Sequence, residues 1–424
     1  MKASGIERSL MIAFLELICL TPLFIILGNV VPPFPIKVHF IAFGLIFVAM
    51  LMLLALHPKK RWVLYLTLTI GLLQYFMPHP SIKNTIDILF GPLVLYVLLD
   101  LLFNQRLAQA TLEKYQRRFI SYLWIPVLIG VLQALGVMPI TFWNADYINW
   151  AYFADGTRLP RPNGFLYHGS ELAIIIFFLA LFQFFKKGSN AFWMLLIFVA
   201  IAKLTLYKAL LGAVIILFFY QLFLMNRTFS QLKLLSKKQL LGYTAILLIV
   251  VSGVVLSFLH GVYQQTGYYF PPQLLTGRGS IWNIYSDAIA DYSVWNYLFG
   301  SGMGSGQELF KEYASPDNYY LLRIDPVLHE AYDAHNAILS LFVNAGIAGI
   351  AFFVWGARRI YQKVKHWKSS VDNGKFFFAM TIIPLLTIGI TIPIFDMAIY
   401  WPCIGFLIYR WRFFSDEPKQ TVDA

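Results

Sequence analysis

The feature that most constrains this chain is a series of apolar segments, each close to the length needed to cross a lipid bilayer. A transmembrane helix needs about 20 mostly apolar residues. Only 13% of the 424 residues are charged, against roughly 25% in soluble domains, so the chain is predicted to be an all-α polytopic membrane protein. The twelve expected spans cover residues 10–30, 36–57, 62–77, 86–103, 119–138, 166–185, 191–206, 209–225, 239–259, 336–356, 376–394 and 397–412.

Basic residues predict how these spans are oriented. Lys and Arg gather at the two termini and in short runs between spans, and with twelve spans all of these places fall on one side of the membrane. Cytoplasmic loops carry the excess of Lys and Arg in membrane proteins, so this side, with both termini, is predicted to be cytoplasmic. The formal net charge of +12 is thereby explained by orientation, and no nucleic acid partner is expected.

A single long polar stretch interrupts the series between the ninth and tenth spans. It covers residues 260–334 and holds eight acidic residues against three basic ones. Residues 1–259 are therefore predicted to contain spans one to nine, residues 335–412 spans ten to twelve, and residues 413–424 a cytoplasmic tail. The positive-inside rule puts the long stretch on the outer side, where water-soluble chemistry can meet a substrate held in lipid.

Two patterns within this loop have structural meaning. Apolar residues recur at helical spacing over 281–292, which predicts an amphipathic helix that lies on the bundle, with Arg278 at its start. Glycines alternate with other residues from Gly300 to Gly306. No Gly-Lys-Ser/Thr sequence follows them and no strand-to-helix unit is evident, so a nucleotide-binding loop is rejected.

The sequence offers little for metal or disulfide chemistry. Its two cysteines, Cys19 and Cys403, both lie inside apolar segments, which excludes a disulfide framework and a Cys-based zinc site. No cluster of His, Asp and Glu with metal-ligand spacing is visible outside the expected spans. We therefore predict neither a metal nor another cofactor.

Several cations lie on or near the outer side, where orientation does not require them. Lys208 falls at a tight hairpin between the seventh and eighth spans, and Arg161 and His168 fall in a Pro- and Gly-rich turn before the sixth. Lysine and arginine at such depths often extend to the headgroups as simple anchors, and that interpretation stays open for all three. Charged residues that face the inside of a bundle are instead candidates for a functional site.

His335 can be placed more sharply, because it directly precedes the expected tenth span. A helix N-terminus disfavours an imidazolium and favours a nearby anion, so His335 would stay neutral there and could act as a base beside a phosphate. The alternative is that Asn336 caps the helix and His335 is only its neighbour. Several cations around one neutral base, without a metal cluster, fit a pyrophosphate leaving group.

These residues resemble the signature of the O-antigen ligase and polymerase superfamily. Twelve spans with one large loop between the ninth and tenth also match that family. The residues that carry the resemblance are Gly277-Arg278, Trp282, Gly300-x-Gly302-x-Gly304, His335-Asn336-Ala-Ile-Leu339, Gly346-Ile347-Ala-Gly349 and the turn Arg161-x-x-Gly164-x-x-x-His168.

The resemblance implies a metal-independent, inverting glycosyltransferase of the integral-membrane GT-C type in the bacterial inner membrane. Such enzymes take a glycan from undecaprenyl pyrophosphate at the periplasmic face. By position, His335 would deprotonate the acceptor hydroxyl and Arg278 would stabilise the departing pyrophosphate. Further residues expected to contact the substrates are Arg161, His168, Lys208, Asn336 and Arg323.

Two acceptors are compatible with this chemistry. A polymerase would extend a lipid-linked repeat unit, and a ligase would join the finished polymer to lipid A–core. The turn that begins at Arg161 is more similar to the polymerase branch, which we therefore prefer. Lys208 departs from the family, which usually has an arginine at that hairpin, and lysine offers charge without a bidentate fork.

A transporter of lipid-linked glycans is the alternative from another class. The chief acidic residues in or near spans are Glu16, Asp87 and Asp100. Paired, interrupted helices with charges at mid-membrane, which are typical of such carriers, are not apparent. Transport also gives no reason for an acidic loop that ends in a histidine.

Overall fold

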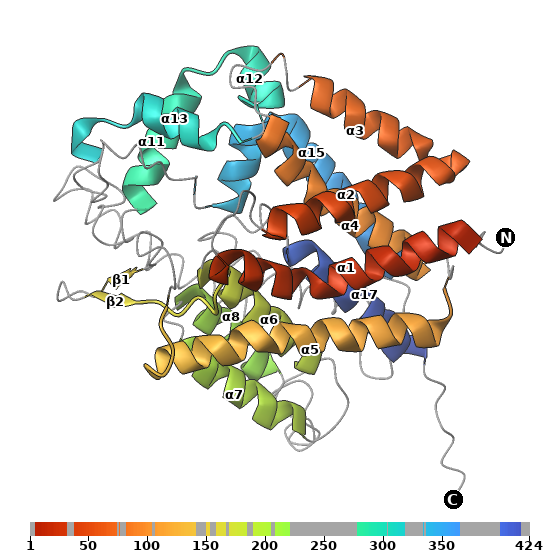
Figure 1. The fold of residues 1–424 in the computed structure, drawn as a ribbon. Coiled ribbons are helices and arrows are strands. Elements are labelled where there is room, and N and C mark those ends of the chain that lie inside the picture. Colours follow the sequence, from red (N-terminus) through yellow and green to blue (C-terminus); the bar gives the residue numbers. More distant parts are fainter. Residues whose placement is uncertain are drawn as a thin grey trace, which may run out of the picture.

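The computed structural model shows a mostly helical protein (Figure 1). It describes residues 5–31, 38–73, 76, 82–103, 107–140, 150–152, 158–166, 169–184, 190–204, 208–220, 278–302, 304–318, 334, 336–364 and 399–416.

Ten of the twelve expected spans overlap a helix, and the other two, 239–259 and 376–394, lie outside the described residues. By length and composition, three stretches in the described residues could cross a membrane: Gly5–Val30, His39–Leu56 and Ala337–Gln362. The ten helices are α1 (Gly5–Val30), α2 (Val38–Leu56), α3 (Arg61–Leu73), α4 (Ile82–Phe103), α5 (Gln109–Ala134), α6 (Gly169–Phe184), α7 (Asn190–Leu204), α8 (Lys208–Tyr220), α15 (Ala337–Val364) and α17 (Tyr400–Asp416).

Helix α6 forms the centre of the bundle. Every side chain from Leu172 to Leu181 is fully buried, and the helix is packed against α5, α7, α8 and α17. A helix that is apolar on all sides is stable only when neighbours surround it. The ring of Phe178 meets that of Tyr400 edge to face at 5.8 Å between centroids, which joins α6 to α17.

Short elements lie outside this bundle. The long loop contributes α11 (Arg278–Ala290), α12 (Val294–Phe299) and α13 (Gly306–Tyr313). The short 3-10 turn η1 (Pro58–Lys60) precedes α3. Between α5 and α6, strands β1 (Trp150–Tyr152) and β2 (Arg158–Pro160) pair antiparallel, with Ala151 opposite Leu159. The sequence analysis expected no strands, and three-residue strands are too short for a period-2 pattern to predict.

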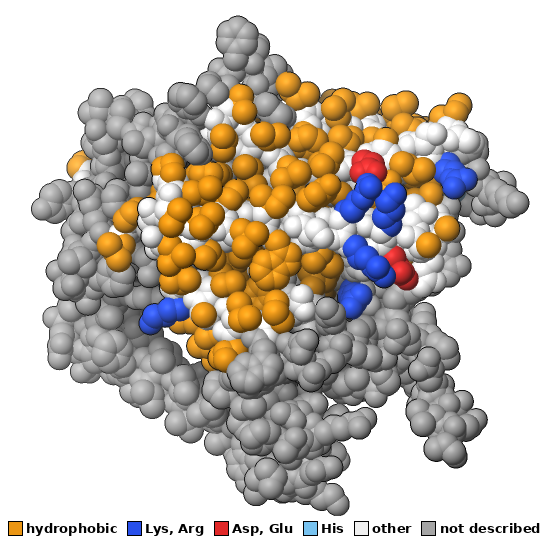
Figure 2. Space-filling model, turned by 60° about the horizontal axis from the view of Figure 1, so that its bottom comes forward, with side chains coloured by type: hydrophobic (Ala, Val, Ile, Leu, Met, Phe, Trp, Pro, Cys, Tyr) orange, Lys and Arg blue, Asp and Glu red, His pale blue; other side chains and the backbone are white. Residues whose placement is uncertain are grey.

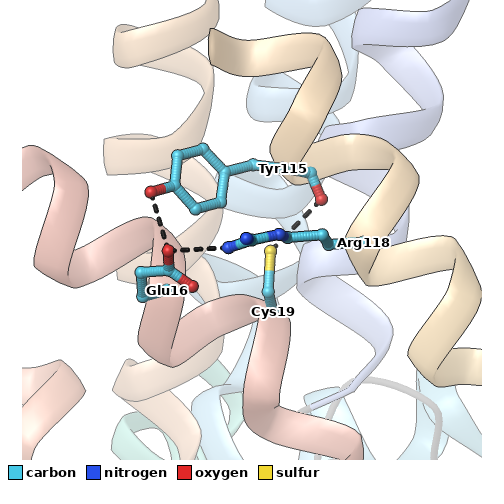
Figure 3. A network of polar contacts seen from close by, with 4 residues as sticks. All are labelled: Glu16, Cys19, Tyr115 and Arg118. Carbon is cyan, nitrogen blue, oxygen red and sulfur yellow. Dashed lines mark hydrogen bonds and ion pairs between the residues drawn. The ribbon is translucent and has the colours of Figure 1, made fainter.

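Charged residues tie helices together at one end of the bundle. The Glu16 carboxylate of α1 accepts hydrogen bonds from the Arg118 guanidinium and the Tyr115 hydroxyl of α5, both at 2.9 Å (Figure 3). Lys60 and Asp100 form a second ion pair, between η1 and α4. Two of the three acidic residues noted in or near spans, Glu16 and Asp100, therefore bind neighbouring elements.

Charged side chains are unevenly distributed on one face of the described structure. On the face drawn in Figure 2, hydrophobic side chains cover most of the described surface, and most charged side chains gather toward the end where α1 begins. Figure 1 shows the end of α17 directed to that same side.

Candidate functional site

Helix α11 begins at Arg278, the position that the sequence predicted for its start. Its apolar side chains Ile281, Ile284, Tyr285 and Ala288 are buried in a small core of their own, against Leu309 and Phe310 of α13 and Val343 of α15. The Tyr285 hydroxyl donates a 2.8 Å hydrogen bond to the carbonyl of Gly306. The expected amphipathic helix is present, and it packs together with α13 on the first half of α15.

A hydrogen bond joins α11 to the residue before His335. The indole Nε1 of Trp282 donates to the carbonyl oxygen of Ala334 at 3.2 Å, and Ala334 is buried in the same small core. Trp282 lies one helical turn after Arg278, so the two share a face of α11. Along the axis of α11, Arg278 therefore lies about one helical turn, roughly 6 Å, from Trp282 and its hydrogen bond to Ala334.

The other neighbour of His335 is Asn336, which caps α15. Its side-chain oxygen accepts hydrogen bonds from the N–H groups of Ile338 and Leu339, at 2.9 and 3.0 Å. A cap of this kind contributes about 1 kcal/mol to the helix. The capping role that the sequence analysis kept as an alternative is thus present, and a contact between Asn336 and substrate stays a prediction.

The alternating glycines pack the loop onto α15. Gly300 and Gly346 both have positive φ, 79° and 61°, and a Cβ on Gly346 would lie 2.6 Å from the backbone nitrogen of Gly300. Gly346 also interrupts the helical geometry of α15. Such a close approach of two backbones is possible only without side chains, which explains the glycines without any phosphate.

Asn344 completes this junction. Its side-chain oxygen accepts a hydrogen bond from Gly304 N–H at 2.6 Å, and its amide donates to the carbonyl of Ser340 at 2.8 Å. The N–H of Ser301 donates to the carbonyl of Val343 at 2.8 Å. A polar residue inside a predicted span therefore satisfies the backbone of a loop 40 residues away in the sequence.

The turn that carries Arg161 is held by a buried glutamine of α5. The Gln133 side-chain oxygen accepts from the N–H groups of Asn163 and Gly164, at 3.0 and 2.8 Å. Phe165, with a φ of 59°, donates its N–H to the side chain of Asn163. Successive N–H groups in such a turn can bind an anion, but these three already have protein acceptors. The turn positions Arg161, whose side chain is partly buried, and its own backbone is not a phosphate cradle.

The remaining predicted residues are described only in part. Lys208 is the first residue of α8 and Arg278 the first of α11, and for both only the backbone is described. His335, His168 and Arg323 lie outside the described residues. Their roles stay predictions.

The residues that hold these segments in place were not among those predicted from the sequence. Gln133 and Asn344 are more than nine-tenths buried, and the side-chain oxygen of each accepts hydrogen bonds from loop N–H groups. An amide side chain within an apolar segment was the available signal, because such a group needs a partner when water is absent. The partner itself could not be read from the sequence.

Asp291, directly after α11, is hydrogen-bonded to Tyr313, the last residue of α13. Burial and a hydrogen bond with the Asp291 carboxylate raise the pKa of the Tyr313 phenol, which keeps it neutral and able to donate. Within the described part of the chain, no group of three or more His, Cys, Asp and Glu side chains is arranged to hold a metal ion.

No protein-family model matches this chain, and no curated protein matches it.

Proposed function

We propose that the protein is a glycosyltransferase that acts at the periplasmic face of the inner membrane, where it transfers a glycan from undecaprenyl pyrophosphate to an acceptor hydroxyl. Its most fitting reaction is polymerisation of O-antigen or capsule-type repeat units. The proposal takes the twelve expected spans, the cytoplasmic termini and the periplasmic loop as its frame, in a bacterial inner membrane.

The single observation that supports it best is the hydrogen bond from Trp282 to Ala334. Arg278 precedes Trp282 by one turn of α11, and His335 follows Ala334 directly, so this bond links the segments that carry the two proposed catalytic residues. A base for the acceptor hydroxyl and a cation for the leaving group must both lie at the glycosidic bond.

The reaction would proceed by direct displacement. His335 Nε2 or Nδ1 takes the proton of the acceptor hydroxyl, and the acceptor oxygen attacks the anomeric carbon as the bond to the pyrophosphate oxygen breaks. Arg278 and Lys208 stabilise the negative charge that develops on the pyrophosphate. Inversion at the anomeric carbon follows from a single displacement.

The proposal is tested with purified protein in lipid vesicles that contain a lipid-linked repeat unit. Wild type should lengthen the glycan and release undecaprenyl pyrophosphate. His335→Ala should reduce this rate by about 10²-fold or more, the usual effect of removing a general base. Near wild-type turnover by this variant, with equal amounts of folded protein, would show that His335 is not the base.

Two matched substitutions separate charge from geometry. Arg278→Lys keeps the charge but loses the bidentate fork, so the rate should fall about tenfold or more. Lys208→Arg adds a fork at the hairpin and should preserve the rate or improve donor binding. Equal, large losses of rate in both variants would contradict the proposal that Arg278 makes a bidentate contact and Lys208 acts through its charge alone.

The ligase alternative shares the donor chemistry and differs in the acceptor. It is distinguished by supplying lipid A–core together with the lipid-linked polymer in the same vesicles. Transfer to lipid A–core, with no extension of the repeat unit, would replace polymerase by ligase and leave the roles of His335 and Arg278 intact. Movement of the lipid-linked glycan across the vesicle membrane, with no new glycosidic bond, would identify a transporter.

A further inference from the structure

One part of the long loop differs from the rest in composition. Between Asp291 and Glu308 lie sixteen residues, 292–307, that contain no charged side chain. The rest of the loop holds eight acidic and three basic residues in total. The uncharged stretch contains α12 and the glycine-rich turn after it.

Helix α12 exposes large apolar side chains. Val294 is 77% exposed and Trp295 56%, and Leu298 and Phe299 are also exposed. No residue of α12 is buried. Scattered apolar residues on a surface need no explanation, but a contiguous patch of this kind marks contact with a partner or with lipid.

The contacts of α12 with α15 indicate how deep it lies. The inner boundary of α15 is marked by Arg358 and Arg359, with the Arg359 guanidinium 5.4 Å from the centre of the Trp355 ring, because tryptophan and arginine favour the membrane–water interface. Gly346 is twelve residues before Arg358, or about 18 Å along the helix at 1.5 Å per residue.

The hydrocarbon core of a bilayer is about 30 Å thick. If α15 spans it, Gly346 lies inside the core, about 18 Å or less from the inner boundary, because tilt of the helix shortens its extent along the membrane normal. Gly346 is in backbone contact with Leu298 and Gly300. The end of α12 therefore reaches the depth of the outer leaflet.

The turn after α12 has the hydrogen bonding that such a depth requires. Irregular backbone is tolerated within the hydrocarbon region only where protein satisfies its polar groups. Gly300 N–H donates to Asn296, Ser301 to Val343, Gly304 to the Asn344 side chain and Ser305 to Gly302. Ser301 and Ser305 are themselves buried.

The arrangement of the helices agrees with this depth. In Figure 1, α12 lies level with the outer ends of α2 and α4, while α11 and α13 extend farther from the bundle. We propose that residues 292–307 form a re-entrant segment that enters the outer leaflet, where Val294, Trp295, Leu298 and Phe299 contact the hydrocarbon chains of membrane lipids.

This inference depends on α15 crossing the membrane and not on glycosyl transfer. It is tested by spin labels on single cysteines at positions 294 and 298, with the protein in lipid nanodiscs. The native cysteines, Cys19 and Cys403, are buried. Position 287 on the exposed side of α11 is the water control, and position 347, which is exposed on α15, is the lipid control.

The quantity measured is the collision rate of each label with oxygen divided by its collision rate with a water-soluble nickel chelate. At 294 and 298 this ratio should be close to that at 347 and several-fold above that at 287. A ratio equal to that at 287 would overturn the proposal. The enzymatic assay is a separate readout, so the two proposals can fail independently.

A second comparison does not need labels. Leu298→Asp should lower the thermal unfolding midpoint in nanodiscs by several degrees, because a carboxylate is costly in hydrocarbon. Ser286→Asp, on the exposed side of α11, should leave the midpoint unchanged. Equal midpoints for the two variants would mean that the α12 face lies in water.

Discussion

At the scale of single residues, buried amides set the shape of this protein outside its regular helices. Gln133 is the clearest case, because its one oxygen accepts from two N–H groups of the Arg161 turn while its amide donates to Pro139 and Asn163. The turn also contains Phe165 with positive φ, a conformation that costs about 1–2 kcal/mol for a residue with a side chain. Gln133 therefore stabilises a turn whose backbone conformation at Phe165 is unfavourable.

Replacement of Gln133 should destabilise the fold. Gln133→Leu would leave the N–H groups of Asn163 and Gly164 buried without their acceptor, at about 1–3 kcal/mol for each group. We predict a loss of about 2 kcal/mol or more, measured as a lower midpoint of thermal unfolding in detergent.

The control for this prediction lies on the same helix. Gln109 of α5 is exposed, and its side-chain amide donates to the neighbouring side chain of Glu113. Gln109→Leu keeps the backbone carbonyl that accepts from the Tyr409 hydroxyl, so it should change stability by less than about 0.5 kcal/mol. Similar midpoints for the Gln133 and Gln109 variants would show that the turn does not depend on Gln133.

At the scale of elements, two of the contacts between the loop and the α15 region matter most. One is the backbone approach between α12 and Gly346, and the other is the Trp282 hydrogen bond from α11 to Ala334. Together they fix both the start and the middle of α15 against the loop. Because His335 directly follows Ala334 in the chain, the second contact lies next to the residue proposed as the base.

The Gly346 junction predicts a steep penalty for a methyl group. In Gly346→Ala the new Cβ would meet the backbone of Leu298 and Gly300 at about 2.5–2.6 Å, and alanine disfavours the positive φ. Separation of α12 from α15 should follow, with a large loss of stability and of transferase activity in the same vesicle assay.

Gly356, ten residues later in α15, provides the control. A Cβ there meets nothing within 4 Å, so Gly356→Ala should stabilise the helix by roughly 0.5–1 kcal/mol. If both alanine variants keep wild-type stability, the close approach at Gly346 is not a constraint on the fold.

The Trp282 contact predicts a kinetic effect more than a structural one. Trp282→Phe keeps an aromatic ring but removes the donor to the Ala334 carbonyl, which weakens the restraint on the segment before His335. We predict that kcat falls by about tenfold or more, because small misplacements of a reacting group are costly, while KM for the donor changes little.

Trp62→Phe on α3 is the matched change at an exposed tryptophan, and its kcat should equal that of wild type. An unchanged kcat in the Trp282 variant would show that the hydrogen bond from Trp282 to Ala334 is not needed for catalysis.

At the scale of the whole molecule, sequence patterns predicted the helices better than the contacts between them. Long apolar runs located ten helices, because a span must satisfy its backbone within itself. Helical spacing also located α11 and its start at Arg278. The α5 helix begins ten residues before its expected span, since its charged first turns pack on α1 through Glu16.

Contacts between distant segments could not be predicted in this way. The Gln133 interaction with the Arg161 turn joins residues about 30 positions apart, and the Gly300–Gly346 contact joins residues of two different elements. Each residue has an ordinary local role as well, as a helix amide or a turn glycine. Only the three-dimensional packing assigns the partner.

The ion pairs at one end of the bundle illustrate the same point. The sequence marked Glu16, Asp87 and Asp100 as acidic residues in or near spans. The structure gives Glu16 and Asp100 each a basic partner from another element, and the side chain of Asp87 is not among those described. Charges that bind neighbouring helices need no transport role. The residues proposed for activity lie elsewhere, on α11, in the Arg161 turn and beside the start of α15.

The most direct test of the central claim is the glycan profile of a bacterium that lacks this protein, resolved on a gel and complemented with wild type or His335→Ala. We predict that lipopolysaccharide or capsule stops at one repeat unit in the deletion strain, that wild type restores the full ladder, and that His335→Ala does not. An unchanged ladder in the deletion strain would contradict the assignment as a glycan polymerase.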